Sequence, residues 1–226
     1  MGVFDYSPSA FNELPSLGKA LDIYEREGVA QHISTSICDI FLRHDARKRY
    51  ALSLLHRHFR MHDSERLLHI GNVAMPWKYS QGSDDNSVMF DGKATAVQWR
   101  FVAGEGEYEG ARGLVPYEFE LNEAGKCGGM SNDSNADADA DFLEDLYGYL
   151  SEHGLLSYIG LSAMPSSSSA VAEEEDEDGC KGSPAPPTVE ITNGRHNIVF
   201  PGGEDTVGSR KAAEVSWVFS EGPLVN

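Results

Sequence analysis

The sequence has little cysteine, few basic residues and no long hydrophobic run. Its three cysteines, Cys38, Cys127 and Cys180, are odd in number and widely spaced, which excludes CxxC zinc and redox motifs and argues against a disulfide framework. We therefore expect free thiols. No apolar run approaches the roughly 18 residues of a membrane span, and the N-terminus lacks the basic-then-apolar pattern of a secretory signal. The expected compartment is the cytoplasm.

Basic residues are half as numerous as acidic ones, with 18 Lys and Arg against 36 Asp and Glu. Twelve of the acidic residues lie in two stretches, residues 133–145 and 173–178, which leaves 24 against the 18 basic residues. Sequence-independent binding to nucleic acid or to an anionic membrane depends on basic patches. The composition therefore predicts a globular protein that binds neither, with 40% hydrophobic residues to form its core.

The chain also lacks the common catalytic signatures. It contains no GxSxG elbow, no P-loop, no GxGxxG after a strand and no HExxH, which are the patterns of hydrolases, nucleotide-binding proteins and zinc proteases. One acidic stretch does have the spacing of an EF-hand loop at Asp133, Asn135, Asp137, Asp139, Asp141 and Glu144. However, the glycine position of that loop is Ala138. Acids before a helix are explained by capping and by the helix dipole, so we expect no calcium site.

Hydrophobic spacing predicts two helices and several strands. The helices rest on apolar residues at helical intervals, each set followed by a glycine: Leu14, Leu17, Leu21 and Tyr24 before Gly28, and Phe142, Leu146, Tyr149 and Leu150 before Gly154. Strands are predicted over residues 51–61, 97–102, 115–121, 188–191, 197–200 and 214–219. Residues 115–121 alternate apolar and polar side chains, the pattern of a half-buried strand.

Residues 166–187 read SSSSAVAEEEDEDGCKGSPAPP, a composition that cannot bury enough apolar surface to offset the cost of ordering. Both flanks, IGLSAMP and TVEITNGRHNIVF, are typical of strands. We therefore predict a single α+β domain over residues 1–226, with helices packed on a mixed, mainly antiparallel sheet and a disordered acidic insertion at residues 166–187.

Two passages of the chain have the same order of features. Residues 17–38 and 141–163 each offer an amphipathic helix, a glycine, a short connection and a small-residue strand. Later in each half, an Arg-His pair precedes apolar residues, in LLHRHF and in GRHNIVF. This order predicts two degenerate repeats. The alternative is that two helix-to-strand passages share the same helix-stop chemistry.

The histidines are concentrated in one window. Five of the eight lie there: His44, His56, His58, His62 and His69. If residues 51–61 form a strand, His56 and His58 share one face, and their ring nitrogens aim at one point. That geometry suits zinc, iron or copper. His62 and His69 lie beside polar residues and are expected at the surface.

Two other interpretations of His56 and His58 remain open. Each can be a core histidine bonded to a carbonyl or carboxylate, or the pair can perform acid–base chemistry without metal. The candidate third ligands are Glu65, Glu118 and Cys38, and spacing does not choose among them. Our predicted ligand set is His56, His58 and Glu65.

Several motifs along most of the chain resemble one family. They are LLHRHF (residues 54–59), Glu65-Arg66, Pro76-Trp77, VPYEF (residues 115–119), the helix ending in EHGL (residues 152–155) and VEITNGRHNIVF (residues 189–200). In this order they resemble a family of small uncharacterised fungal proteins with an LLH-R/K-HF strand; the acidic insertion departs from that pattern. The chain is also similar to the zinc-containing, hemocyanin-like cyclopenases, which contract a benzodiazepine ring to the viridicatin quinolone scaffold in fungal alkaloid biosynthesis.

The resemblance to cyclopenases implies a zinc-dependent lyase or isomerase that acts on a small secondary metabolite. His56 and His58 would bind the zinc, which would polarise a substrate oxygen as a Lewis acid. Glu118 would be the proton shuttle, and Tyr117 beside it could line the pocket. A dicopper site is not implied, because the six helical histidines that it needs are absent. The alternative function is noncatalytic binding of a small molecule or a protein partner, with structural histidines.

Overall fold

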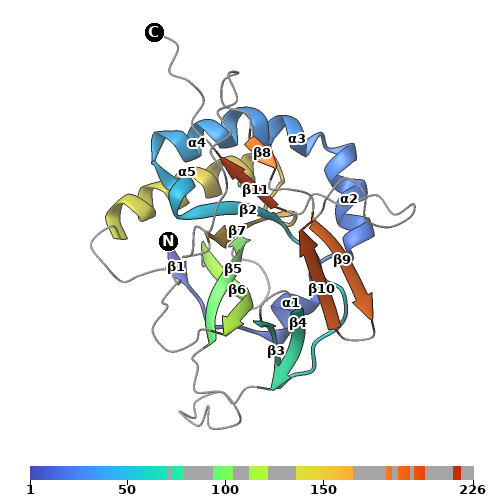
Figure 1. The fold of residues 1–226 in the computed structure, drawn as a ribbon. Helices are drawn as coiled ribbons and strands as arrows, with labels where there is room; N and C mark the ends of the chain where they lie inside the picture. Colours follow the sequence, from blue (N-terminus) through green and yellow to red (C-terminus); the bar gives the residue numbers. More distant parts are fainter. Residues whose placement is uncertain are drawn as a thin grey trace.

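The computed structural model in Figure 1 describes residues 1–70, 73–78, 94–103, 112–121, 136–164, 182–184, 188–193, 196–201 and 216–219. The strands are β1 (Gly2–Val3), β2 (Tyr50–Leu54), β3 (Glu65–Ile70), β4 (Val73–Lys78), β5 (Ala94–Ala103), β6 (Arg112–Leu121), β7 (Ile159–Ala163), β8 (Gly182–Pro184), β9 (Thr188–Asn193), β10 (His196–Pro201) and β11 (Ser216–Phe219). The helices are α1 (Pro8–Asn12), α2 (Leu17–Arg26), α3 (Val29–His32), the π-helix η1 (Ile33–Ile37), α4 (Cys38–Arg43), the 3-10 helix η2 (Ala46–Lys48) and α5 (Ala136–Glu152).

The described strands form one sheet in the order β8-β11-β2-β7-β5-β6-β3-β4-β10-β9, with β1 added beside β6. Within these strands, only the pairs β1–β6 and β3–β6 are parallel. Helices α2 to α5 form an arc along one side of the sheet (Figure 1). The predicted fold class, helices packed on a mixed, mainly antiparallel sheet, is confirmed.

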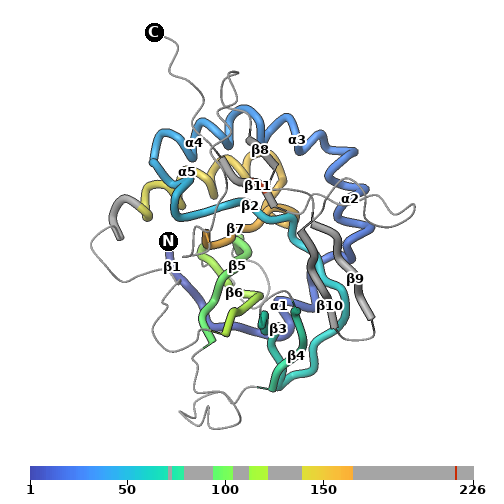
Figure 2. Tube along the Cα trace, in the orientation of Figure 1, coloured from blue at the N-terminus to red at the C-terminus, as the bar shows by residue number. Residues whose placement is uncertain are grey.

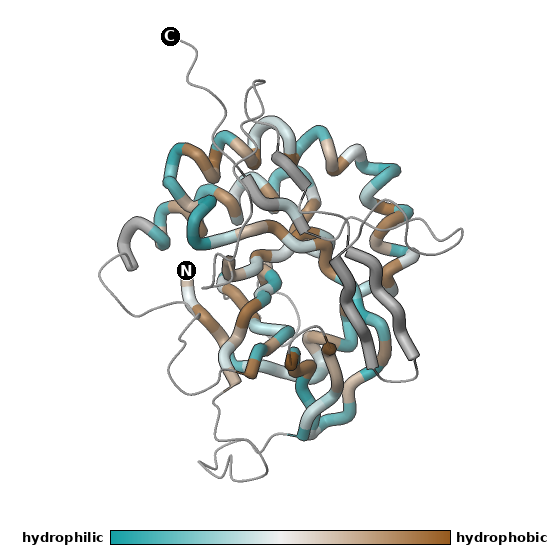
Figure 3. The backbone as a smooth tube through the Cα atoms, viewed as in Figure 1, coloured by the Kyte–Doolittle hydropathy of each residue, from teal (hydrophilic) through white to brown (hydrophobic). Residues whose placement is uncertain are grey.

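Both predicted helices are present and end where the glycines require. Gly28 follows α2 with φ 62° and Gly154 follows α5 with φ 68°, the left-handed conformation that glycine adopts without steric cost. In Figure 3, teal and brown segments alternate along these helices, as expected for elements with one buried face.

The predicted internal repeat does not extend past the helix ends. The second passage continues as predicted from α5 into strand β7, but the first continues from Gly28 into α3 and η1. Residues 33–37, the small-residue strand of the repeat hypothesis, are therefore helical. What the two passages share is the glycine that ends each helix, which is the alternative interpretation.

Strands β3 and β4 have no counterpart among the predicted strands. Pro76 in β4 argues against a central strand, because proline cannot donate a ladder hydrogen bond. Among the described residues, β10 pairs with β4 only at Val73 and Ala74, and no described strand pairs with Pro76 on that side of β4. Of the predicted disordered insertion, residues 182–184 form β8, which corrects its boundary. Residues 166–181 and 185–187 lie outside the described residues.

The two larger of three hydrophobic clusters lie against the sheet. The helix-side core joins residues of α2 to α5 to apolar side chains of the sheet, among them Ile37, Phe41, Leu52, Leu54, Trp99, Phe101, Phe142, Leu146 and Leu161. The N-terminal core lies under the first 14 residues and contains Tyr6, Phe11, Leu14, Leu55, Met61, Leu67, Leu68, Ala74, Tyr117 and Phe119. Both faces of the central strands are therefore covered.

A single hydrogen bond shows that the sheet is curled. The Ser53 Oγ and Tyr117 Oη atoms lie 3.1 Å apart, although β2 and β6 are separated by β7 and β5 in the sheet order. In a flat sheet these strands would be about 14 Å apart, since neighbours are spaced by about 4.8 Å. The sheet must therefore bend so that Ser53 and Tyr117 face each other across its concave side.

Cys38, at the start of α4, is disulfide-bonded and fully buried in the helix-side core. This corrects the expectation of three free thiols; the partner cysteine lies outside the described residues. In the part of the chain that the structure describes, no helix combines the length and hydrophobicity of a membrane span.

Candidate functional site

The histidine segment is not the strand that the sequence predicts over residues 51–61. Strand β2 ends at Leu54, and the following residues cross from β2 toward β3 along the side of the molecule (Figure 2). The segment is nevertheless held firmly. Leu55 N donates to Tyr158 O at 2.7 Å, Arg57 N donates to Pro15 O at 2.8 Å, and Arg57 Nε donates to Leu14 O at 2.8 Å.

Asn12, at the end of α1, fixes the far end of the same segment. Its Nδ2 atom donates to Met61 O at 2.9 Å, and its Oδ1 atom accepts from Met61 N at 2.8 Å. The Phe59 ring packs against Phe11, with centroids 6.5 Å apart. The turn between α1 and α2 thus replaces a neighbouring strand as the support for His56 and His58.

The two imidazole rings converge, as predicted. His56 Nε2 lies 3.1 Å from His58 Nε2, and the rings are nearly perpendicular at 89°. His56 Nδ1 lies 2.7 Å from Leu54 O, and a carbonyl can only accept, so Nδ1 carries a proton. In neutral His56 the Nε2 lone pair then faces His58. His56 is buried, with 8% of its surface exposed.

This geometry fits two ligands of a zinc ion. Tetrahedral zinc with Zn–N bonds near 2.0–2.1 Å separates two ligand nitrogens by about 3.3 Å, close to the 3.1 Å between the Nε2 atoms. The backbone carbonyl bonded to the other nitrogen of His56 is the usual outer support of a ligating imidazole. Ligation would also require His58 to carry its proton on Nδ1.

The structure does not bring Glu65 into this pair. Glu65 Oε2 instead accepts from His62 N at 3.0 Å, and Glu65 O accepts from the Tyr6 hydroxyl at 2.7 Å. Cys38 cannot supply a thiolate while it is disulfide-bonded. Among the residues that the structure describes, no three His, Cys, Asp or Glu side chains gather to hold a metal ion.

Glu118 and Tyr117, the predicted catalytic residues, belong to one hydrogen-bonded network. Glu118 Oε2 accepts from His69 Nε2 at 2.7 Å and from Gln98 Nε2 at 2.9 Å. The Tyr117 hydroxyl donates to Gln98 Oε1 in a short hydrogen bond, and Ser53 donates to the Tyr117 oxygen at 3.1 Å. We call these five side chains the interior network. Glu118 and Tyr117 are 7% and 1% exposed.

Sequence reasoning missed three members of the interior network. His69 was expected at the surface, but its side chain is only 21% exposed and is bonded to Glu118; His62, by contrast, is exposed as expected. Gln98 and Ser53 carry no sequence signal, because single amides and hydroxyls in strands are common. The alternating pattern of residues 115–121 also predicts that Glu118 faces solvent. Glu118 is buried instead, because both faces of β6 are covered and residues 113–119 are all buried.

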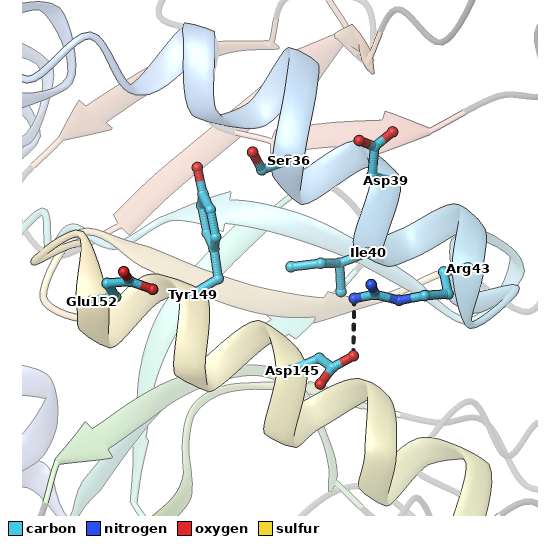
Figure 4. A pocket seen from close by; sticks show the side chains of 7 residues that line it. All are labelled: Ser36, Asp39, Ile40, Arg43, Asp145, Tyr149 and Glu152. Carbon is cyan, nitrogen blue, oxygen red and sulfur yellow. Dashed lines mark hydrogen bonds and ion pairs between the residues drawn. The ribbon is translucent and has the colours of Figure 1, made fainter.

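A surface groove lies between η1–α4 and α5 (Figure 4). It encloses about 370 Å³ and is lined by Ser36, Asp39, Ile40, Arg43, Asp145, Tyr149 and Glu152. The Arg43 guanidinium donates to Asp145 at 2.9 Å. Both side chains of this pair are about half exposed or more, so the pair is weak. The groove presents solvated charges, whereas the interior network holds desolvated ones.

The calcium-like stretch has a structural role where the structure describes it. Residues 136–152 form the regular helix α5, so the last positions of the EF-hand pattern are helical. Asp139 Oδ1 accepts from Arg49 Nε at 2.9 Å, and Oδ2 accepts from the Tyr50 hydroxyl at 3.1 Å. Burial, and then the charge of Asp139, raise the pKa of Tyr50. Asp133 and Asn135 lie outside the described residues.

The fold and site define an α+β protein with a curled sheet, a convergent histidine pair and a buried hydrogen-bonded network. Comparison of the chain with protein-family models, with curated proteins and with solved structures finds no match. The resemblance to a fungal family and to cyclopenases therefore stays a prediction.

Proposed function

We propose that this protein is a zinc-dependent lyase or isomerase that acts on a small molecule, with His56 and His58 as zinc ligands and Glu118 as the group that accepts a proton from the substrate. The observation that carries the proposal is the 3.1 Å approach of the two Nε2 atoms, with His56 Nδ1 anchored on Leu54 O. Ring contraction of a secondary metabolite is the reaction that the resemblance to cyclopenases implies.

Two parts of the chain supply the groups that the proposed reaction needs. The α1–α2 turn fixes the backbone around Arg57, so the two imidazoles are oriented before any ligand binds, which lowers the cost of binding. When bound, zinc would supply Lewis acidity. Catalytic zinc sites have three protein ligands and one position open to water or substrate, so this site would need a third protein ligand besides the two histidines. The Glu118 carboxylate, held by His69 and Gln98, would accept the proton.

Zinc content tests the proposal directly. We expect purified wild-type protein to contain near-stoichiometric zinc by elemental analysis, and the His56→Ala, His58→Ala double variant to lose it. His62→Ala, which removes an exposed histidine of the same window, is the matched control and should keep the metal. A folded double variant with undiminished zinc, or a wild-type protein that takes up no zinc on titration, contradicts the proposal.

A noncatalytic binding protein is the second candidate, and one observation favours it. His58 can donate directly to His56 Nε2, which pairs the two facing nitrogens without a metal, and the described residues provide no third ligand. In that case the double variant would unfold more easily by about 1–3 kcal/mol, the cost of losing buried hydrogen bonds and packing, while wild-type and variant proteins would both be free of zinc.

A further inference from the structure

The β5–β6 pairing is irregular at the interior network. Its register pairs Ala96 with Phe119, Gln98 with Glu118 and Trp99 with Pro116, so one residue of each strand, Val97 and Tyr117, is passed over. Consecutive strand residues normally point to opposite faces. A bulge re-aims one of them, which explains how neighbouring side chains, those of Tyr117 and Glu118, both reach the amide of Gln98.

The amide of Gln98 can bind its two neighbours in only one direction. Its oxygen accepts from the Tyr117 hydroxyl and its nitrogen donates to Glu118 Oε2. A rotated amide would place its oxygen against the carboxylate oxygen, which cannot donate, and would lose the bond to Glu118. The fixed amide therefore directs the Tyr117 hydroxyl proton at the Gln98 oxygen and an amide N–H group at Glu118.

The second donor to Glu118 uses the same oxygen. His69 Nε2 and Gln98 Nε2 both bond to Oε2, and in the described part of the chain Glu118 Oε1 makes no hydrogen bond. Glu118 as a residue is 7% exposed, and Oε1 is not among the buried atoms without a partner, so this oxygen is accessible to solvent or to a small ligand. One oxygen is thus held and the other remains able to accept a proton.

We propose that Gln98 is the positioning residue of an acid–base pair, in which Tyr117 is the proton donor and Glu118, through Oε1, is the proton acceptor. This inference rests on the proposed function for the role of Glu118 and extends it to Tyr117, Gln98 and the bulge. If the interior network only stabilised the fold, it would make the same hydrogen bonds. It would give Glu118 no reactivity toward a carbon acid.

A generic carbon acid distinguishes the two roles without knowledge of the substrate. In 5-nitrobenzisoxazole, a base removes the ring C–H proton, the electron pair of that bond forms a nitrile, and the N–O bond breaks to release a coloured phenolate. The reaction is followed in the presence of a metal chelator, so its outcome is independent of zinc content. A protein that binds no zinc can still pass this test, and a zinc protein can fail it.

We expect wild-type protein to accelerate ring opening and Glu118→Gln to lower the rate by about 100-fold, the usual contribution of a general base. Gln98→Met removes both amide bonds at similar volume and should lower the rate by about tenfold through misplacement. Gln98→Asn, which retains an amide, should recover part of the rate that Gln98→Met loses. The control Thr95→Ala lies in the same strand and should leave the rate unchanged.

Carbon-13 NMR of labelled tyrosine and glutamate checks the proton positions in the same variants. The Tyr117 resonance should move when the Glu118 carboxyl group is replaced by an amide in Glu118→Gln. In Gln98→Met that response should vanish. A wild-type rate no higher than that of Glu118→Gln, or a rate in Gln98→Met equal to that of wild type, overturns the proposal.

Discussion

Tyr50 and Arg49, the residues at the start of β2, bind the same carboxylate. Asp139 accepts from the Arg49 guanidinium and from the Tyr50 hydroxyl, and the Tyr50 ring stacks on Phe142 with centroids 5.5 Å apart. These contacts fasten the first turns of α5 to the sheet. Because Tyr50 is buried beside an anion, its ionisation is opposed in the folded state.

Alkaline pH should therefore destabilise the protein through Tyr50. In the folded protein the pKa of Tyr50 is raised above its ordinary value. In the unfolded chain the Tyr50 hydroxyl loses its proton near the usual pKa of about 10. The contribution to stability is complete below pH about 10 and is lost as the pH rises above it. In Tyr50→Phe the free energy of unfolding should be about 1 kcal/mol lower at neutral pH and should fall less steeply above pH 10.

Urea unfolding at neutral pH and at two pH values above 10 measures both effects. One titrating group changes the slope by at most about 1.4 kcal/mol per pH unit. Tyr158→Phe, which removes a tyrosine that does not contact Asp139, is the comparison. Parallel pH dependences for wild-type protein and Tyr50→Phe would show that Tyr50 ionisation does not oppose folding.

Single-residue chemistry was predictable where a short motif determines it. The His-x-His spacing predicts two convergent rings, and the Nε2 atoms do converge, although the supporting backbone is not a strand. The partners of Glu118 were not predictable. Gln98 and His69 are 20 and 49 residues away in the sequence, and they meet Glu118 only because the strands are neighbours and the register shifts.

At the scale of elements, the contact between β2 and β7 depends on a glycine. Gly160 pairs with Ser53, and a Cβ atom added at Gly160 would lie 2.6 Å from Leu55 Cδ2, 2.8 Å from Trp99 O and 2.9 Å from Ser53 Oγ. Two of these neighbours are fixed, one by the backbone of β5 and one by the interior network. Because Gly160 has no side chain, strands β2, β7 and β5 can pack closely around Ser53.

Gly160→Ala should consequently lower the free energy of unfolding by about 1–3 kcal/mol, the usual cost of overpacking a core. The same substitution at Gly148 in α5, where nothing lies within 4 Å of the added Cβ, should instead raise it by about 0.5–1 kcal/mol, because alanine favours a helix interior. Chemical denaturation of the two variants gives the comparison. Equal effects at both positions would mean that the close packing at Gly160 is not maintained in solution.

Elements with a strong periodic pattern or a glycine stop were predictable, as α2, α5 and β6 show. The helices after Gly28 were not, because HISTSI is rich in β-branched residues whose local preference is for strands. Packing decides otherwise, since Ile33 and Ile37 are buried in the helix-side core. Likewise, Pro76 prevented the prediction of β4. A strand tolerates proline at an edge position, and the sequence does not show which strands become neighbours.

At the scale of the whole molecule, the curl of the sheet determines what its two faces do. The helices cover one face with apolar contacts, and the concave face collects the interior network, where Tyr117 reaches Ser53 across two intervening strands. The sequence could not reveal this arrangement, because it arises from the order of strands that are distant in the chain. The curl brings the predicted residues Tyr117 and Glu118 into contact with residues that no pattern identifies.

The disulfide of Cys38 is a property of the whole chain that thiol counting can test. One disulfide among three cysteines leaves one thiol, so denatured protein, purified without reductant, should react with one equivalent of a thiol reagent, and with three after reduction. Cys38→Ser should release its partner and give two before reduction. Three equivalents in the unreduced wild-type protein would restore the expectation of free thiols. That outcome would also agree with the predicted cytoplasmic location, because stable disulfides belong mainly to oxidising compartments.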